Sequence, residues 1–100
     1  MMNKAQVVAL LREQQSYLAS EYGVRRIGLF GSFANGLPDD ASDVDLVVEF
    51  ARPIGLRFIA LGDYLERILS RRVDILTPDG LRAIRRVSVA ESIAKSIVYV

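Results

Sequence analysis

Two carboxylates open an apolar stretch near the middle of the chain. Asp43 and Asp45 are separated by one residue and lead into the Leu-Val-Val run at 46–48. In a β-strand, side chains two residues apart point to the same face, about 6.6 Å apart along the chain. At a separation of about 4 Å and an effective dielectric of about 20, two like charges repel by roughly 4 kcal/mol, so such a pair favours a bound cation. Mg²⁺ suits this place, because it commonly takes one or two carboxylates and completes its shell with waters and substrate phosphates.

Three further candidate site residues lie in the sequence before and after this pair. Gly31 and Ser32 follow an apolar run and open at most one helical turn, where backbone amides and a hydroxyl can hold an anion. Asp74 lies within the apolar run "RVDIL". Taken singly, these features are more often a loop cap, a turn and a salt-bridged strand edge. Taken together, they indicate donors for a triphosphate, two carboxylates for two metal ions and a third carboxylate beside them.

Helices are expected on both sides of these motifs. A capping signal at Asn3 and Gln6, helically spaced apolar residues and a closing Gly23 predict one helix over 4–22. The segment from Ser32 to Ser42 is expected to hold a short helix and a loop. Later in the chain, the apolar spacing predicts a long helix over 54–70 and a further helix that opens at Thr77 and Pro78, with Leu81, Ile84 and Val87 as its apolar face.

Strands are expected between these helices. Runs rich in β-branched and large apolar residues predict strands over 24–30, 43–50 and 72–76, and the tail 96–100 is expected to be a short strand or a docked extension. The alternation predicts an α/β fold, a sheet covered by helices, in a single domain over 1–100. The three strands are candidates to be neighbours, and each would bring its polar residues to the same end of the sheet.

Composition excludes several other chemistries. The chain has no Cys and no His, so disulfide frameworks, thiolate chemistry, His general bases and zinc catalysis are excluded. A net charge of +1 gives no reason to expect nonspecific binding to nucleic acid or anionic lipid. No window approaches the ~18 apolar residues of a membrane span, and the apolar run near the N-terminus is a poor signal peptide. The expected location is the cytoplasm, without membrane association.

The motifs resemble those of a known superfamily. "GS", ten residues, and then "DVD" followed by an apolar run match the G-S-x(n)-D-x-D signature of the DNA-polymerase-β-like nucleotidyltransferases. The downstream "RRVDILTPDGL" is similar to the segment that carries the third acid in the smallest members, the minimal nucleotidyltransferases (MNT). The likeness covers residues 24–81 well and both ends loosely, and the third segment makes it specific.

The MNT resemblance implies a fold, a site and a partner. The fold would be of the α+β type, a small mixed sheet with helices packed on it. Asp43, Asp45 and Asp74 would be the catalytic and metal-binding residues, with two Mg²⁺ ions, and Gly31 and Ser32 would bind the nucleotide. MNT proteins are typically encoded beside a HEPN-domain toxin, a small helical RNase, and act as its antitoxin. Some are similar to enzymes that transfer AMP from ATP to a tyrosine of that toxin, so the resemblance implies a hetero-oligomer with a HEPN protein.

Other functions stay open on the residues alone. Phe33 and Asn35 stand where these proteins frequently carry basic residues, which favours an antitoxin that inhibits by contact with its nucleotide site idle. The chain could instead be the catalytic half of a small-molecule nucleotidyltransferase whose acceptor domain is a separate chain. A hundred residues leave no room for an acceptor domain, which favours a protein acceptor. Direct nucleic-acid binding is not expected, because the arginines come without interleaved aromatic residues that stack bases.

Overall fold

A mixed sheet of four strands frames the protein. The computed structural model describes residues 2–36, 38, 42–84, 91, 93 and 95–100. The strand order is β3-β2-β1-β4, with β1 antiparallel to both of its neighbours and β2 parallel to β3. The strands are β1 (Val24–Phe30), β2 (Val44–Phe50), β3 (Val73–Leu76) and β4 (Val98–Tyr99). The predicted mixed sheet is confirmed, and the three predicted strands are neighbours.

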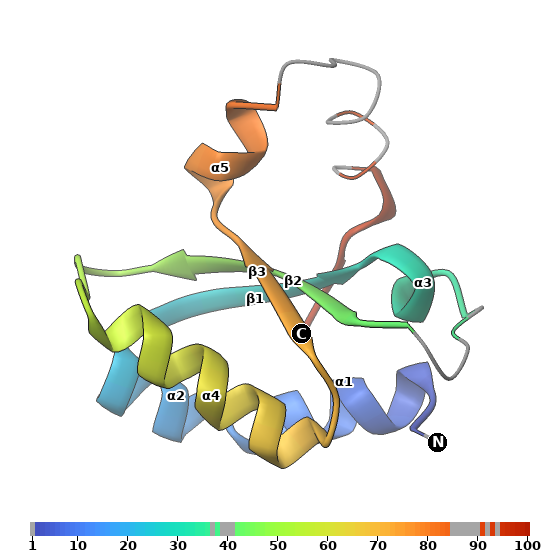
Figure 1. Cartoon of the computed structure of the whole chain (residues 1–100), viewed down its shortest axis with the longest axis horizontal. Coiled ribbons are helices and arrows are strands. Elements are labelled where there is room, and N and C mark those ends of the chain that lie inside the picture. The colour runs from blue at the N-terminus through green and yellow to red at the C-terminus, as the bar shows by residue number, and fades with distance from the viewer. Residues whose placement is uncertain (1, 37, 39–41, 85–90, 92, 94) are drawn as a thin grey trace.

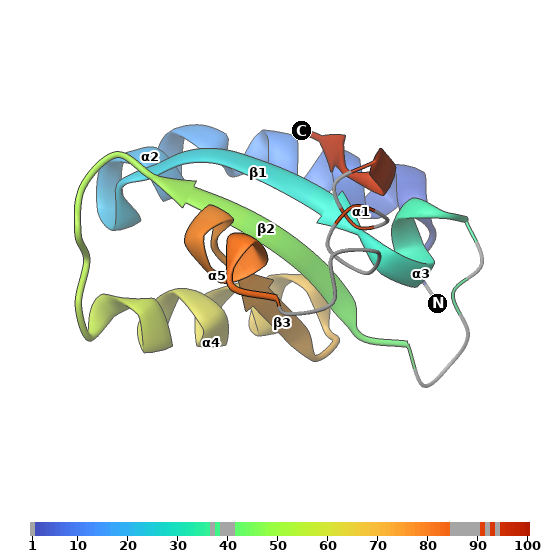
Figure 2. The ribbon, with the colours of Figure 1, turned by 90° about the horizontal axis from the view of Figure 1, so that it is seen from above.

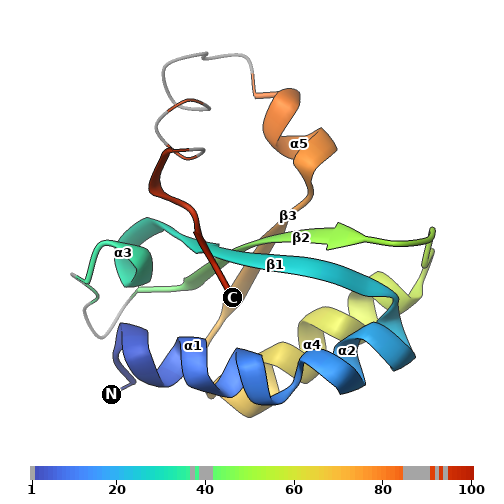
Figure 3. The same cartoon turned by 180° about the vertical axis from the view of Figure 1, so that it is seen from behind.

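Helices cover the two faces of this sheet unequally. Figure 1 shows α1 (Lys4–Glu13), α2 (Gln15–Tyr22) and α4 (Arg57–Leu69) together on one face, and α5 (Pro78–Arg82) on the other. The one-turn helix α3 (Gly31–Ala34) follows β1 directly and lies at the end of the sheet where β2 begins (Figure 2). Seen from behind, the end of the chain places β4 beside β1 (Figure 3). No helix in the described ranges is long and apolar enough to cross a membrane.

Alternation along β2 gives the two faces of the sheet different roles. Val44, Leu46 and Val48 are fully buried in the core, and each such side chain contributes roughly 1.5–3 kcal/mol through burial. Because successive strand side chains point to opposite faces, Asp45, Val47 and Glu49 lie on the face where α5 stands. The core between the sheet and the helical layer is completed by apolar side chains of both: Val7, Leu11, Leu18, Ile27, Leu29, Leu61, Leu65 and Leu69.

Two helix boundaries differ from the prediction. The expected single helix over 4–22 is wrong, because it is divided at Gln14, whose amide is shared between the carbonyls of Leu10 and Leu11 at 3.2 Å each. This mixed i−4 and i−3 bonding tightens the last turn of α1. Helix α4 begins at Arg57 instead of 54, because the preceding residues form i to i+3 turns such as the bond from the Arg57 amide to the Ile54 carbonyl.

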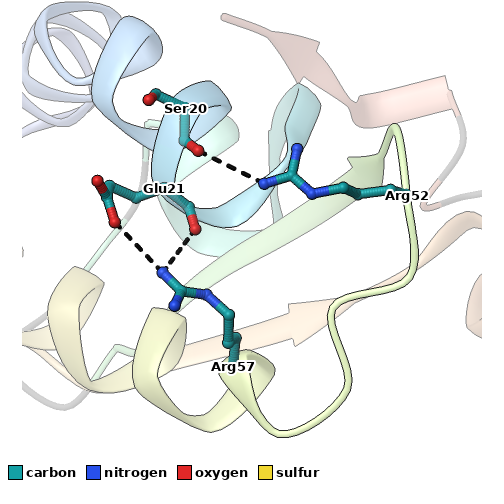
Figure 4. A network of polar contacts seen from close by, with 4 residues as sticks. All are labelled: Ser20, Glu21, Arg52 and Arg57. Atoms are coloured by element: carbon teal, nitrogen blue, oxygen red, sulfur yellow. Dashed lines mark hydrogen bonds and ion pairs between the residues drawn. The ribbon is translucent and has the colours of Figure 1, made fainter.

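Two arginines tie the C-terminal end of α2 to the segment that joins β2 and α4 (Figure 4). Nη2 of Arg57 donates to the Glu21 carbonyl at 2.6 Å and pairs with the Glu21 carboxylate at 3.3 Å. Nη2 of Arg52 donates to the Ser20 carbonyl at 3.4 Å. These bonds satisfy carbonyls that a helix end leaves without partners. Gly23, with φ of 65°, ends α2 as predicted, and the Arg52 side chain packs where a Cβ of residue 23 would lie.

Strand β3 forms one edge of the sheet and carries four residues. Its entry is held on both sides, by a bond from the Val44 amide to the Arg72 carbonyl at 2.9 Å and by a bond from the Val73 amide to Oε2 of Glu66 at 3.0 Å. As predicted, Thr77 then caps α5, accepting from the Gly80 amide at 3.0 Å. Helix α5 ends at Arg82, so the prediction that Ile84 continues its apolar face is wrong, and Val87 lies outside the described residues.

Candidate active site

Strand pairing brings the ends of three strands to one place. Phe30 at the end of β1 lies opposite Asp45 near the start of β2, and Asp45 lies opposite Asp74 of β3. Since Gly31 follows Phe30 directly, Gly31, Asp45 and Asp74 meet at the end of the sheet beside α3. The order of the motifs predicted this convergence, and the strand register supplies its reason.

Gly31 is in direct contact with the Asp45 carboxylate. Gly31 has φ of 73°, a left-handed conformation that favours glycine. A Cβ on residue 31 would overlap Oδ2 of Asp45, closer than any real Cβ approaches a neighbour. The absence of a side chain at Gly31 therefore creates the space in which the Asp45 carboxylate sits, against the backbone that leads into α3.

The three aspartates form a cluster of like charges. The pKa of Asp45 is raised above its ordinary value of 3.8, first by burial and then by the charges of Asp74 and Asp43. The predicted strand over 43–50 began one residue too early, because β2 starts at Val44 and Asp43 precedes it. Asp43 is half-buried and Asp74 is exposed. Among the ion pairs of the described residues, none involves any of the three. The cluster is thus acidic, and none of its carboxylates has an ion-pair partner among the described residues.

This donor set fits Mg²⁺. A desolvated carboxylate facing two others is destabilised until a cation neutralises it, and carboxylate oxygen is a ligand that Mg²⁺ prefers. Within the described ranges, no three acidic side chains are grouped closely enough to hold a metal ion by themselves. Phosphate oxygens and waters would therefore have to complete the coordination, as is usual for Mg²⁺ at a nucleotide site.

The side chains of α3 divide between surface and core. Ser32 is exposed, so its hydroxyl and the adjacent backbone are accessible at the end of the sheet that carries Asp45. Phe33 is fully buried and belongs to the core. The aromatic residue at position 33 therefore does not occupy the space in front of the carboxylates.

Comparison with known protein families matches the model of the nucleotidyltransferase domain over residues 11–100, which includes every residue of this cluster. The chain belongs to the nucleotidyltransferase family. A relative from Thermococcus cleftensis, the protein adenylyltransferase MntA, is 35% identical over 101 residues, which cover the whole of this chain and 98% of the relative.

Solved structures of similar proteins have the same fold. A structure described as a minimal nucleotidyltransferase is 30% identical, with a TM-score of 0.70, and the match covers 97% of this nucleotidyltransferase and 95% of that chain. A structure of the tri-AMPylated HEPN toxin of Shewanella oneidensis in complex with its MNT antitoxin has a TM-score of 0.54 at 20% identity, covering 97% of this chain and 67% of that one. The second likeness shows the fold alone.

The raised pKa of Asp45 predicts a pH dependence of the metal-free nucleotidyltransferase. A carboxyl whose pKa is raised by folding holds its proton more tightly in the folded state, so stability falls as the pH rises from about 4 through the raised pKa. Asp45→Asn removes this loss, and its melting temperature without Mg²⁺ should exceed that of the wild type at pH 7 and approach it near pH 4. Melting curves over this range, with EDTA present, measure the effect, and parallel curves for the two proteins would contradict it.

A groove of about 740 Å³ lies beyond this cluster on the same face of the sheet. It is lined by residues of α5, by the segment after β2 and by strand residues that include Arg26 and Val47. Its lining contains none of the five residues predicted for the site. Two of the three arginines in this lining pair with carboxylates of the lining, Arg26 with Glu49 at 3.5 Å and Arg82 with Asp79, whereas Arg52 donates to the Ser20 carbonyl.

One contact near the cluster was not predicted from the sequence. Arg71 donates from both Nε and Nη2 to the carbonyl of Ser42, the residue before Asp43, at 3.0 and 2.6 Å. In the sequence, Arg71 is one of two consecutive arginines ahead of the third strand and has no local feature that distinguishes it from a solvated side chain.

Proposed function

We propose that this nucleotidyltransferase is a Mg²⁺-dependent protein adenylyltransferase that acts as an antitoxin, transferring AMP from ATP to a tyrosine hydroxyl of a partner HEPN toxin. The observation that carries the proposal is the contact of Gly31 with Asp45 opposite Asp74, in a cluster of carboxylates whose charges raise the pKa of Asp45. The naming of the Thermococcus relative as a protein adenylyltransferase, and the AMPylated HEPN toxin in the Shewanella complex, support a protein acceptor and a HEPN partner.

The chemistry is an in-line displacement at the α-phosphorus of ATP. The acceptor oxygen forms a bond to this phosphorus, the bond from phosphorus to the bridging oxygen of the β-phosphate breaks, and pyrophosphate leaves. Two bound Mg²⁺ ions would supply charge neutralisation for the attacking and leaving oxygens. Asp43 and Asp45 would hold them, and the open backbone at Gly31 with the Ser32 hydroxyl would orient the departing phosphates. Asp74 would share a metal ion and accept the acceptor's proton.

The reaction needs little more from the protein than these groups. Nucleotidyl transfer depends mainly on positioning and charge, so a site without Cys or His is sufficient. The acceptor has to be presented by another molecule, and the start of α4 offers a surface for contact with one. Leu56 and Ile59 there are 86% and 64% exposed. Such apolar exposure fits a hetero-oligomer with a protein partner, and the use of ATP fits a cytoplasmic location.

Asp74 should matter more for the transfer step than for nucleotide binding, because it is carried by a different strand from Asp43 and Asp45 and is exposed. Asp74→Asn is expected to keep most of the melting-temperature rise caused by Mg²⁺ and ATP. Its transfer rate should fall by about 10², the scale of a lost general base. Thermal shift and single-turnover transfer assays measure the two effects separately. A variant with full transfer activity would make Asp74 a structural strand residue.

The proposed function is tested with the protein encoded beside this chain, which we expect to be a HEPN protein. Incubation of both proteins with labelled ATP and Mg²⁺ should label the HEPN protein, and toxin recovered from cells should be heavier by one or more AMP units at a tyrosine. The Asp43→Asn, Asp45→Asn variant should still form the complex yet fail to protect cells. Protection by this variant with an unmodified toxin would instead identify an antitoxin that acts by contact alone. Labelling of a small molecule and not of the protein would identify the catalytic half of a small-molecule transferase.

A further inference from the structure

Arg71 connects three parts of the candidate active site. Its guanidinium donates two hydrogen bonds to the Ser42 carbonyl, immediately before Asp43. The same group lies 5.2 Å from the ring centroid of Phe33, the residue that follows Ser32 in α3. Arg71 is also three residues ahead of Asp74, at the entry to β3. The half-buried side chain of Arg71, at the entry to β3, therefore contacts both α3 and the residue that leads into Asp43 and β2.

The bonds from Arg71 to Ser42 act beside Asp43, the part of the site that strand pairing fixes least. Asp45 is held by pairing on both sides, with Phe30 and with Asp74. Asp43 precedes the first residue of β2 and has no partner in the register. The backbone around it is fixed by Arg71 at Ser42 and by the bond from the Val44 amide to the Arg72 carbonyl. Arg71 and Arg72, at the entry to β3, thus form hydrogen bonds with the residues on either side of Asp43.

We propose that Arg71 is a positioning residue, which holds the Asp43 backbone against β3 and α3 so that the carboxylates of Asp43 and Asp45 converge on the same metal and phosphate groups. The catalytic part of this inference rests on the proposed function, whereas the positioning part concerns the ligand-free chain. A planar guanidinium suits the role, because it can donate twice to one carbonyl while lying against an aromatic ring. Lysine has no equivalent of this geometry.

The ligand-free protein tests the positioning directly. In Arg71→Gln, amide hydrogen exchange at Val44 and Asp45 should accelerate by about tenfold, because local opening of the β2 entry becomes easier. The matched control is Arg67→Gln, which removes an exposed arginine in the last turn of α4 and should leave exchange at these amides unchanged. Exchange in Arg71→Gln within twofold of the wild type would overturn the proposal, whatever the protein catalyses.

The transfer reaction tests the consequence for the site. Misplacement of a reacting group by about 1 Å can cost 10²-fold in rate, so Arg71→Gln should lower kcat by about 10 to 10² and raise the half-saturating Mg²⁺ concentration several-fold. KM for the acceptor protein should stay unchanged. Arg71→Lys should recover only part of the loss, and Phe33→Leu, which keeps an apolar side chain but removes the ring, should show a smaller effect of the same kind.

Failure of this inference differs from failure of the proposed function. If the wild type transfers no AMP, the proposed function fails, and the exchange measurement still decides whether Arg71 fixes the Asp43 backbone. If exchange accelerates but kcat and the Mg²⁺ requirement match those of the wild type, Arg71 is a structural residue and the positioning role is overturned. A lowered melting temperature in Arg71→Gln, with kcat unchanged at a temperature where the variant is folded, leads to the same conclusion.

Discussion

Replacement of Asp43 and Asp45 together by asparagine should abolish both the Mg²⁺-dependent stabilisation by nucleotide and the transfer of AMP. At a ligand concentration about 100-fold above Kd, binding adds about 2.7 kcal/mol to the stability. For a domain of this length, that corresponds to a rise in melting temperature of about 10 °C or more. The variant should show no such rise, and its transfer rate should fall by about 10³ or more, since metal ions supply several kcal/mol of transition-state stabilisation.

Thermal shift with Mg²⁺ and the nonhydrolysable analogue AMP-PNP measures the binding part of this prediction. The matched control is Asp63→Asn, which removes an exposed carboxylate of α4 and should respond to nucleotide as the wild type does. An undiminished response in the Asp43→Asn, Asp45→Asn protein would remove the metal role from this cluster. The nucleotide would then have to bind elsewhere on the chain.

Gly31→Ala should inactivate the protein through a single added methyl group. The new Cβ would overlap Oδ2 of Asp45, so the carboxylate has to move from its position in the cluster. We expect a fall in transfer rate of about 10² to 10³, because a displaced ligand is close in effect to a missing one. The left-handed backbone at residue 31 adds a stability cost of about 1–2 kcal/mol.

Gly36→Ala provides the control that separates these two effects. Gly36 has φ of 72°, nearly that of Gly31, but a Cβ there would meet no atom of the described residues within 4 Å. The two variants should therefore lose similar stability, whereas only Gly31→Ala should lose transfer activity beyond its loss of folded protein. Rates measured well below both melting temperatures decide the matter, and equal activities would show that the Gly31 contact has no part in the chemistry.

Much of the fold follows from the sequence because its signals are local. β-Branched runs marked the three main strands, and the capping residues Asn3 and Thr77 marked where helices begin. The break at Gln14 escaped prediction, since the amphipathic period runs through it, and Gln14 also accepts a bond from the Tyr64 hydroxyl, 50 residues away. The start of α4 was placed too early because residues 54–56 form turns that apolar spacing does not distinguish from a helix.

Only part of the candidate site could be predicted from the sequence, because only part of it depends on local signals. The residue types and order of Gly31, Ser32, Asp43, Asp45 and Asp74 could be recognised in the sequence. Their register, with Asp45 between Phe30 and Asp74, depends on pairing between segments far apart in the chain. The contact of Arg71 with Ser42 spans 29 residues and has no local signature. Sequence patterns therefore indicated the candidate groups, and tertiary packing decides how they are held.

The edge position of β3 also bears on the response of this protein to heat. Its four residues pair with the sheet on one side, and they carry Asp74. Short edge segments open locally at a lower free-energy cost than the whole domain unfolds. Warming would then separate β3, which carries Asp74, from the sheet while β1, β2 and their helices stay folded. The proposed transfer of AMP would therefore stop below the melting temperature of the chain. Under the proposed function, a heated cell would then keep a folded protein that no longer transfers AMP, and the edge strand would set the upper temperature of the reaction.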